Sequence, residues 1–242
     1  MLLKAVNCER LKCKGTLIWP AFLLIPIIPV IMGAGNYLTN LAILKTEWYA
    51  LWTQISLFYS NFFFAPLIGV YCAFLWRFEN FHSCRNTLLT QPVSLRVIYS
   101  SKYLMVCAIT FLTQLWLAVL YLAAGKIAGL PGLPPSDIIG WIIRGTLGGF
   151  VIATIQYLTA SVITNFAIPI AVGLFGGISG LLIANTRYGI CWPYSLMTLG
   201  MNSNKENDML NGQLPLFLLF MILYIILFNL IGIRMLKRNH SI

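Results

Sequence analysis

The chain has 242 residues, of which 59% are hydrophobic and only 9% are charged. Soluble proteins carry roughly 25% charged residues, which keep the folded surface hydrated. This shortfall excludes a disordered chain and most soluble enzymes. The length suits one membrane domain over residues 1–242, and we expect an all-α protein that crosses the membrane several times.

The formal net charge of +10 suggests a nucleic-acid partner until the charges are placed along the chain. Lys and Arg lie mostly in clusters that flank apolar runs, a pattern that sets membrane orientation. We therefore expect a lipid bilayer and no nucleic acid as a partner. The clusters place both termini in the cytosol.

The first segment, residues 1–16, is expected to lie at the membrane interface, with Leu2, Leu3, Val6 and Cys13 toward lipid. Six apolar runs follow, each long enough for a span of about 20 residues. The predicted spans are 17–37, 55–76, 103–124, 138–163, 166–184 and 214–233.

Three connections between these spans have distinct compositions. Before the second span, Trp48, Tyr49 and Trp52 match the aromatic belt of a membrane interface. Residues 77–102 form the longest cytosolic loop. Residues 185–213 form the largest outer loop, and a re-entrant course for part of it is left open.

Motifs for chemistry are missing from the sequence. No G-x-x-x-x-G-K-[ST], H-E-x-x-H or G-x-S-x-G motif occurs. All six acidic residues lie outside the predicted spans, whereas membrane enzymes and proton-coupled carriers usually bury carboxylates within them. The six cysteines have no metal-ligand spacing. We expect no catalytic site, no metal site and no cofactor bound by this chain.

The loop at 77–102 contains a short amphipathic pattern. Phe78, Phe81, Arg85 and Leu88 or Leu89 recur at helical spacing, and Pro92 ends the pattern. Such a helix could dock into a soluble partner. The alternative is a basic anchor that lies on the membrane surface.

Three stretches resemble the permease subunits of type-2 ABC exporters, in particular the lantibiotic-immunity permeases. These are Glu9-Arg10-Leu11-Lys12-Cys13-Lys14-Gly15-Thr16, then Trp48 to Gln54 leading into Phe62-Phe63-Phe64, and the loop from Trp76 to Ser94 with Lys102. The resemblance covers essentially the whole chain in order and hydropathy. Gly15, Cys8 and Cys13 depart from the family's usual first stretch, so the interfacial segment is expected to pack differently.

The resemblance implies a division of labour between subunits. A separate ABC ATPase would bind ATP and Mg²⁺, and a second permease, a different paralogue, would join the complex. Part of residues 185–213 would dip back into the outer leaflet. The substrate would be an antimicrobial peptide, and the location a bacterial cell membrane. The residues implied to couple this chain to the ATPase are Phe78, Glu79, Phe81, His82, Arg85, Leu88 and Leu89.

Within the spans, two further sets of residues are candidates for function. Small-xxx-small spacing predicts close helix packing, either between permeases or within this subunit, at Gly173, Gly176, Gly177 and Gly180. Arg144 and Gln156 are candidates for a substrate path. For Arg144 the alternative is a side chain that reaches to the headgroups.

Two other functions stay open from the sequence. One is a permease for a different substrate, such as bacitracin, sodium or a lipid. The other is a membrane immunity or sensor protein that binds a peptide without transporting it.

Overall fold

The computed structural model describes residues 1–80, 93–205 and 207–238. Every regular element in these ranges is a helix, as the composition predicts. In chain order the elements are α1 (Leu2–Cys13), α2 (Ile18–Leu24), α3 (Ile27–Thr39), α4 (Trp48–Phe58), η1 (Tyr59–Phe63), α5 (Phe64–Asn80), α7 (Leu95–Ile127), α8 (Asp137–Val162), α9 (Ala167–Ala184), η2 (Gly189–Cys191), α10 (Ser195–Gly200) and α11 (Leu214–Arg238).

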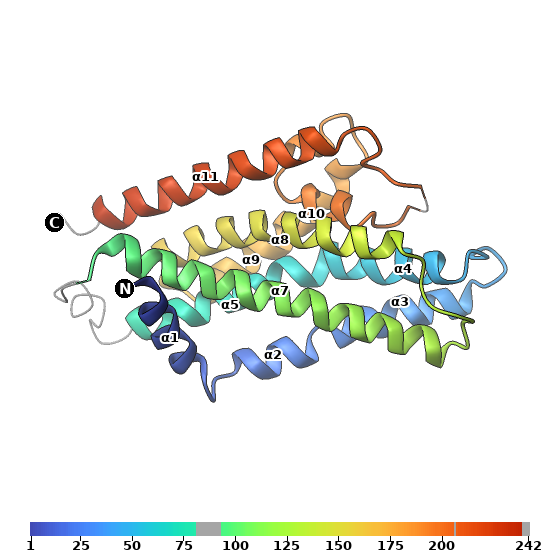
Figure 1. The fold of residues 1–242 in the computed structure, drawn as a ribbon, viewed down its shortest axis with the longest axis horizontal. Helices are drawn as coiled ribbons and strands as arrows, with labels where there is room; N and C mark the ends of the chain where they lie inside the picture. The colour runs from blue at the N-terminus through green and yellow to red at the C-terminus, as the bar shows by residue number, and fades with distance from the viewer. Residues whose placement is uncertain (81–92, 206, 239–242) are drawn as a thin grey trace.

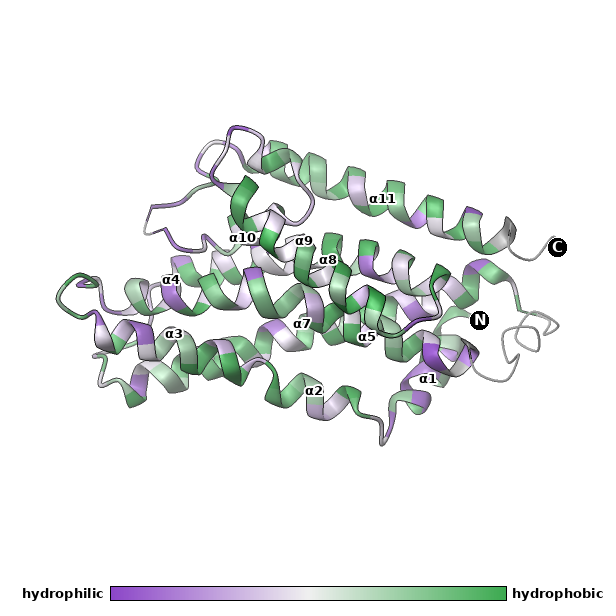
Figure 2. Ribbon diagram, turned by 180° about the vertical axis from the view of Figure 1, so that it is seen from behind, coloured by the Kyte–Doolittle hydropathy of each residue, from purple (hydrophilic) through white to green (hydrophobic). Residues whose placement is uncertain are grey.

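The long helices form an elongated bundle, and α1 lies at one end of it (Figure 1). Within the described residues, six helical stretches are long and apolar enough to cross a membrane: Ile18–Thr39, Trp48–Arg77, Leu95–Ile127, Asp137–Val162, Ala167–Ala184 and Leu214–Leu236. Figure 2 shows hydrophobic residues along most of α11, whereas α1 alternates between hydrophilic and hydrophobic residues. The expected six-span all-α fold is confirmed.

The start of α1, the end of α5, the start of α7 and the end of α11 all lie at the same end of the bundle (Figure 1). We call this the N-terminal end. The connections between α3 and α4 and between α7 and α8 lie at the opposite end. This arrangement follows from an even number of spans and places both chain termini on one side, although which side faces the cytosol stays a prediction.

The second helical stretch begins earlier than the predicted span at 55–76. It runs without interruption from α4 through a π-helical turn, η1, into α5. Trp48 and Trp52 are buried, and their indole N–H groups donate to Pro131 O at 2.7 Å and Met201 O at 2.8 Å. The expected aromatic belt is therefore wrong for these two residues, because their rings pack inside the bundle.

The helix α7 also exceeds the predicted span at 103–124, and its first two turns occupy the end of the expected loop 77–102. Ser94 caps the helix by accepting a hydrogen bond from Val97 N at 3.4 Å. Lys102 therefore sits on a helix rather than in a loop.

Residues 185–205 and 207–213 are folded rather than an open loop. They contain η2 and α10, and all six residues of α10 are buried. Thr198 donates to Asn61 Oδ1 at 2.8 Å, and Ser60 donates to Ser203 Oγ at 3.2 Å, so side chains of η1 hold this segment. Whether it re-enters a bilayer stays a prediction.

Candidate functional site

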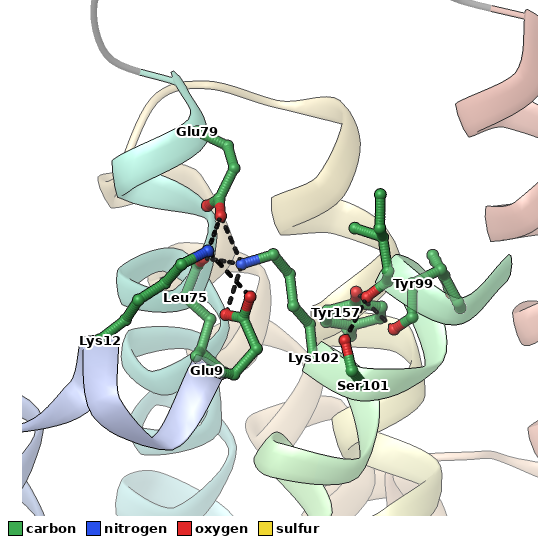
Figure 3. Close-up of polar contacts among 9 residues, drawn as sticks. Glu9, Lys12, Leu75, Glu79, Tyr99, Ser101, Lys102 and Tyr157 are labelled. Carbon is green, nitrogen blue, oxygen red and sulfur yellow. Dashed lines mark hydrogen bonds and ion pairs between the residues drawn. The ribbon is translucent and has the colours of Figure 1, made fainter. Parts of the chain in front are cut away.

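Four charged side chains from three helices form a buried ion cluster at the N-terminal end (Figure 3). Lys102 Nζ lies 2.6 Å from Glu9 Oε2 and 2.7 Å from Glu79 Oε1, and it also donates to Leu75 O at 3.0 Å. Lys12 Nζ lies 2.9 Å from Glu9 Oε1 and 2.9 Å from Glu79 Oε1. Each lysine therefore bridges both carboxylates, and the four formal charges cancel.

Local structure explains how these side chains meet. Glu9 and Lys12 are three residues apart on α1, so they project from the same face of that helix. This face also carries Cys13, which is buried, so the expectation that Cys13 faces lipid is wrong. Glu79 lies in the last turn of α5, and Lys102 lies two turns into α7. The cluster thus joins α1, α5 and α7.

Burial makes these contacts strong. The Lys102 side chain is 0% exposed and that of Glu79 is 4% exposed, whereas Lys12 is 38% exposed. Lys102 Nζ also lies 5.6 Å from the centre of the Trp76 ring, a cation–π distance. A single charge so buried is very unfavourable, but neutral clusters with short contacts are tolerated. Removing one of the four charged side chains leaves a net charge among the other three.

The cluster sets the charge states of its members. Burial alone raises the pKa of Glu79, but the charge and hydrogen bond of Lys102, followed by those of Lys12, outweigh it. The net pKa of Glu79 lies below its ordinary value. Burial alone lowers the pKa of Lys12, but Glu79 and then Glu9 raise it above its ordinary value. Both groups are therefore charged at neutral pH.

This geometry changes the expected role of Glu79. A residue that contacts an ATPase directly would point outward, but the Glu79 carboxylate is held inside by two lysines. In this structure Glu79 ties the end of α5 to α1 and α7, and its part in coupling to an ATPase stays a prediction. The sequence contains only a weak indication of this cluster. The resembling stretches contain Glu9, Lys12, Glu79 and Lys102, which are opposite charges in a chain with few charges.

Most other residues of the expected coupling loop cannot be placed in the same way. Phe81, His82, Arg85, Leu88 and Leu89 lie outside the described residues. The backbone at Phe78 belongs to α5. Their role in coupling stays a prediction.

The four glycines of α9 face other parts of this chain. A Cβ on Gly173 would lie 2.6 Å from Ala65 O, and one on Gly177 would lie even closer to the Asn61 carbonyl. Positions Gly176 and Gly180 face Tyr194 in the same way. The small residues let α9 approach η1, α5 and the segment before α10 within one subunit.

The two candidates for a substrate path have partners inside the chain. Gln156 is fully buried, and one orientation of its amide satisfies both of its polar atoms. The nitrogen then donates to Pro169 O at 2.7 Å, and the oxygen accepts from Gly173 N at 2.9 Å and the Tyr194 hydroxyl at 3.1 Å. Arg144 Nη1 forms an ion pair with Asp208 Oδ2 at 2.9 Å, linking α8 to the segment after α10.

The described residues contain no group of three or more His, Cys, Asp or Glu that could hold a metal ion. Residues 5–180 match the family model described as ABC-2 family transporter protein. No curated protein and no solved structure matches the chain. The match includes α1, the end of α5 and the start of α7, and therefore the whole ion cluster.

Proposed function

We propose that this chain, which belongs to the ABC-2 family of transporter proteins, serves an exporter that removes lantibiotic or similar antimicrobial peptides from the membrane. The family and the six apolar helices support a multi-pass membrane permease of an ABC exporter. The family also implies a separate ABC ATPase as partner, and the proposal adds a second permease subunit. ATP and Mg²⁺ would bind to the ATPase.

The observation that carries the coupling part of this proposal is the buried ion cluster. Residues 81–92 connect α5 to α7, and Glu79 and Lys102, on the helices at either side of this connection, are ion-paired with each other. A partner that moves the connection would therefore move α5, α7 and α1 together. This is the mechanical requirement for converting ATPase closure into motion of the spans.

The peptide part of the proposal rests on the apolar character of the spans. The described ion pairs join α1, the last turn of α5 and the first turns of α7, or join Arg144 of α8 to the segment after α10. The helices expose large apolar side chains along their length. A substrate that already lies in the membrane suits such a surface better than a hydrated ion does, because an ion needs polar ligands along its route.

A pull-down in mild detergent tests the subunit composition. The tagged chain is expected to bring down an ATPase, and the eluate to hydrolyse ATP. Phe81→Asp is expected to reduce recovery of the ATPase, because Phe81 is predicted to dock into it. Leu133→Asp is the matched control, since Leu133 is 79% exposed at the opposite end of the bundle. A chain that purifies alone in several detergents would contradict the exporter and favour a stand-alone immunity or sensor protein.

A resistance panel tests the substrate. Cells that lose this chain are expected to become sensitive to lantibiotics, with unchanged sensitivity to bacitracin and sodium. Loss of resistance to bacitracin or sodium alone would keep the permease and reject the peptide.

A further inference from the structure

A lateral groove lies between α7 and α8, away from the ion cluster. Its volume is about 410 Å³, and its walls are apolar, with Phe111 and Leu115 from α7 and Ile143 and Phe150 from α8. Ile143 is 57% exposed, so the groove opens at the side of the bundle, where lipid surrounds the spans.

One polar side chain in this groove lacks partners. Gln114 lines the groove and is 1% exposed, and neither its amide nitrogen nor its amide oxygen forms a hydrogen bond with a described residue. Thr110 lies one turn earlier on α7, and its hydroxyl is also buried without a partner there. Thr110 does not line the groove, and the hydroxyl that does, that of Thr146, donates to Ile142 O on its own helix.

The position of Gln114 makes this observation unusual. It is close to Gly145, since a Cβ on Gly145 would lie 3.4 Å from Gln114 Nε2. Gln114 itself is about 20 Å from the nearer end of α7 at 1.5 Å per residue, in the middle part of the apolar stretch Leu95–Ile127. Unpaired polar groups at this depth are strongly unfavourable because lipid tails offer no hydrogen bonds. Gln156, equally buried, has all of its amide groups paired.

The unpaired groups indicate the chemistry of a ligand. A matching group must offer a donor to the amide oxygen and an acceptor to the amide nitrogen at once. A backbone peptide group does both, whereas a lipid acyl chain does neither and a lipid ester only accepts. A peptide that is not fully helical carries such groups unpaired in the membrane.

We propose that the groove between α7 and α8 binds an apolar peptide segment, with a backbone peptide group hydrogen-bonded to Gln114. The inference rests on the proposed function, since it gives that function's peptide a binding site. The apolar walls would hold the peptide's side chains. Gln114 is 1% exposed, so this binding requires its side chain to change rotamer and turn the amide toward the groove.

Photo-crosslinking of the full chain in lipid nanodiscs tests this site. A benzoylphenylalanine is placed at Ile143, inside the groove, or at Leu112, which is 41% exposed on α7 but does not line it. The probe is a short biotin-labelled peptide of Leu, Val, Gly and Pro. We expect saturable labelling from position 143 and several-fold less from position 112.

Two changes then remove these hydrogen bonds, one in the protein and one in the peptide probe. Gln114→Leu is expected to weaken binding of the probe by about tenfold, the effect of one or two net hydrogen bonds. The same probe with an N-methylated backbone should bind weakly to both forms. The variant is expected to fold normally, because an apolar side chain replaces an unpaired amide. Ala118→Phe should block the groove, and Val119→Phe, outside the groove, should not.

Equal labelling of the native chain and Gln114→Leu by the peptide probe would overturn the proposal. The amide would then be satisfied by water or lipid rather than by a peptide. The test is independent of export because it needs neither ATP nor the partner. Gln114-independent binding with intact peptide resistance would reject the groove and keep the function. Gln114-dependent binding without any resistance phenotype would keep the groove and reject the peptide exporter.

Discussion

The substitution Lys102→Met tests the central role of the ion cluster. Methionine has similar length to lysine and is apolar, so it fills the same space without its charge. The change removes two ion pairs, at 2.6 and 2.7 Å, and the hydrogen bond to Leu75 O. Glu9 and Glu79 would then share Lys12 alone, and their carboxylates would carry one uncompensated negative charge in a buried site.

The expected effect is large for a single residue. Breaking one side of a buried ion pair costs about 3–5 kcal/mol, because the partner charge is left behind. For a chain of this size, that loss lowers the midpoint of thermal unfolding by roughly 6–20 °C. Lys12→Met should cost less, since Lys12 is partly exposed. Lys14→Met is the control, because Lys14 is exposed and forms no ion pair with a described residue.

Thermal unfolding in detergent, followed by intrinsic fluorescence at one scan rate, measures these effects. The double variant Lys102→Met with Glu79→Gln should recover part of the loss, because it also removes one orphaned carboxylate. The two effects would then differ from additivity by about 1–3 kcal/mol. If Lys102→Met unfolds at the same temperature as Lys14→Met, or if the two changes are additive, the reasoning about this cluster is refuted.

Three further outcomes follow from the structure. The folded-state pKa of Glu79 is lowered, so its stabilisation is complete above the ordinary Glu pKa and is lost as pH falls through the lowered value. The difference in unfolding temperature between the native chain and Glu79→Gln should therefore be constant near neutral pH and shrink in acid, and a difference that grows in acid would contradict this sign. Gly177→Ala should lower the free energy of unfolding by about 1–3 kcal/mol, because the new methyl group would contact the η1 backbone. Gly140 has open space around it, so Gly140→Ala should leave the free energy of unfolding unchanged or raise it. Cys8 and Cys191 are both exposed, so each can be labelled in a variant that keeps only that cysteine. A membrane-impermeant maleimide added to intact cells should label Cys191 and not Cys8. The reverse result would invert the predicted orientation.

The sequence predicts the spans well because hydropathy is a local property. Each long apolar run is helical, although the first is divided into α2 and α3, and the last two predicted spans begin within one residue of α9 and α11. Helix ends within polar segments are less predictable. The helix of Lys102 begins at Leu95, because Ser94 caps it and the cluster inside the bundle stabilises its first turns.

The ion cluster itself could not be predicted from composition or spacing. Glu9 and Lys102 are far apart in the sequence, and only packing of α1 against α7 brings them together. The same reason applies to Trp52, whose aromatic side chain matches a membrane interface by type but forms a hydrogen bond within the bundle. Hydropathy assigns residues to the membrane, and it does not distinguish contact with lipid from contact with another helix.

The uninterrupted helix from Trp48 to Asn80 has a mechanical consequence. It is about 50 Å long at 1.5 Å per residue. Glu79 fixes one end of this rod to α1 and α7, and near the other end Trp52 is bonded to Met201. If the helix moves as one body, a small tilt at the N-terminal end would displace the segment around α10 as well. The π-helical turn η1, where backbone pairing changes, is the natural place for this rod to flex.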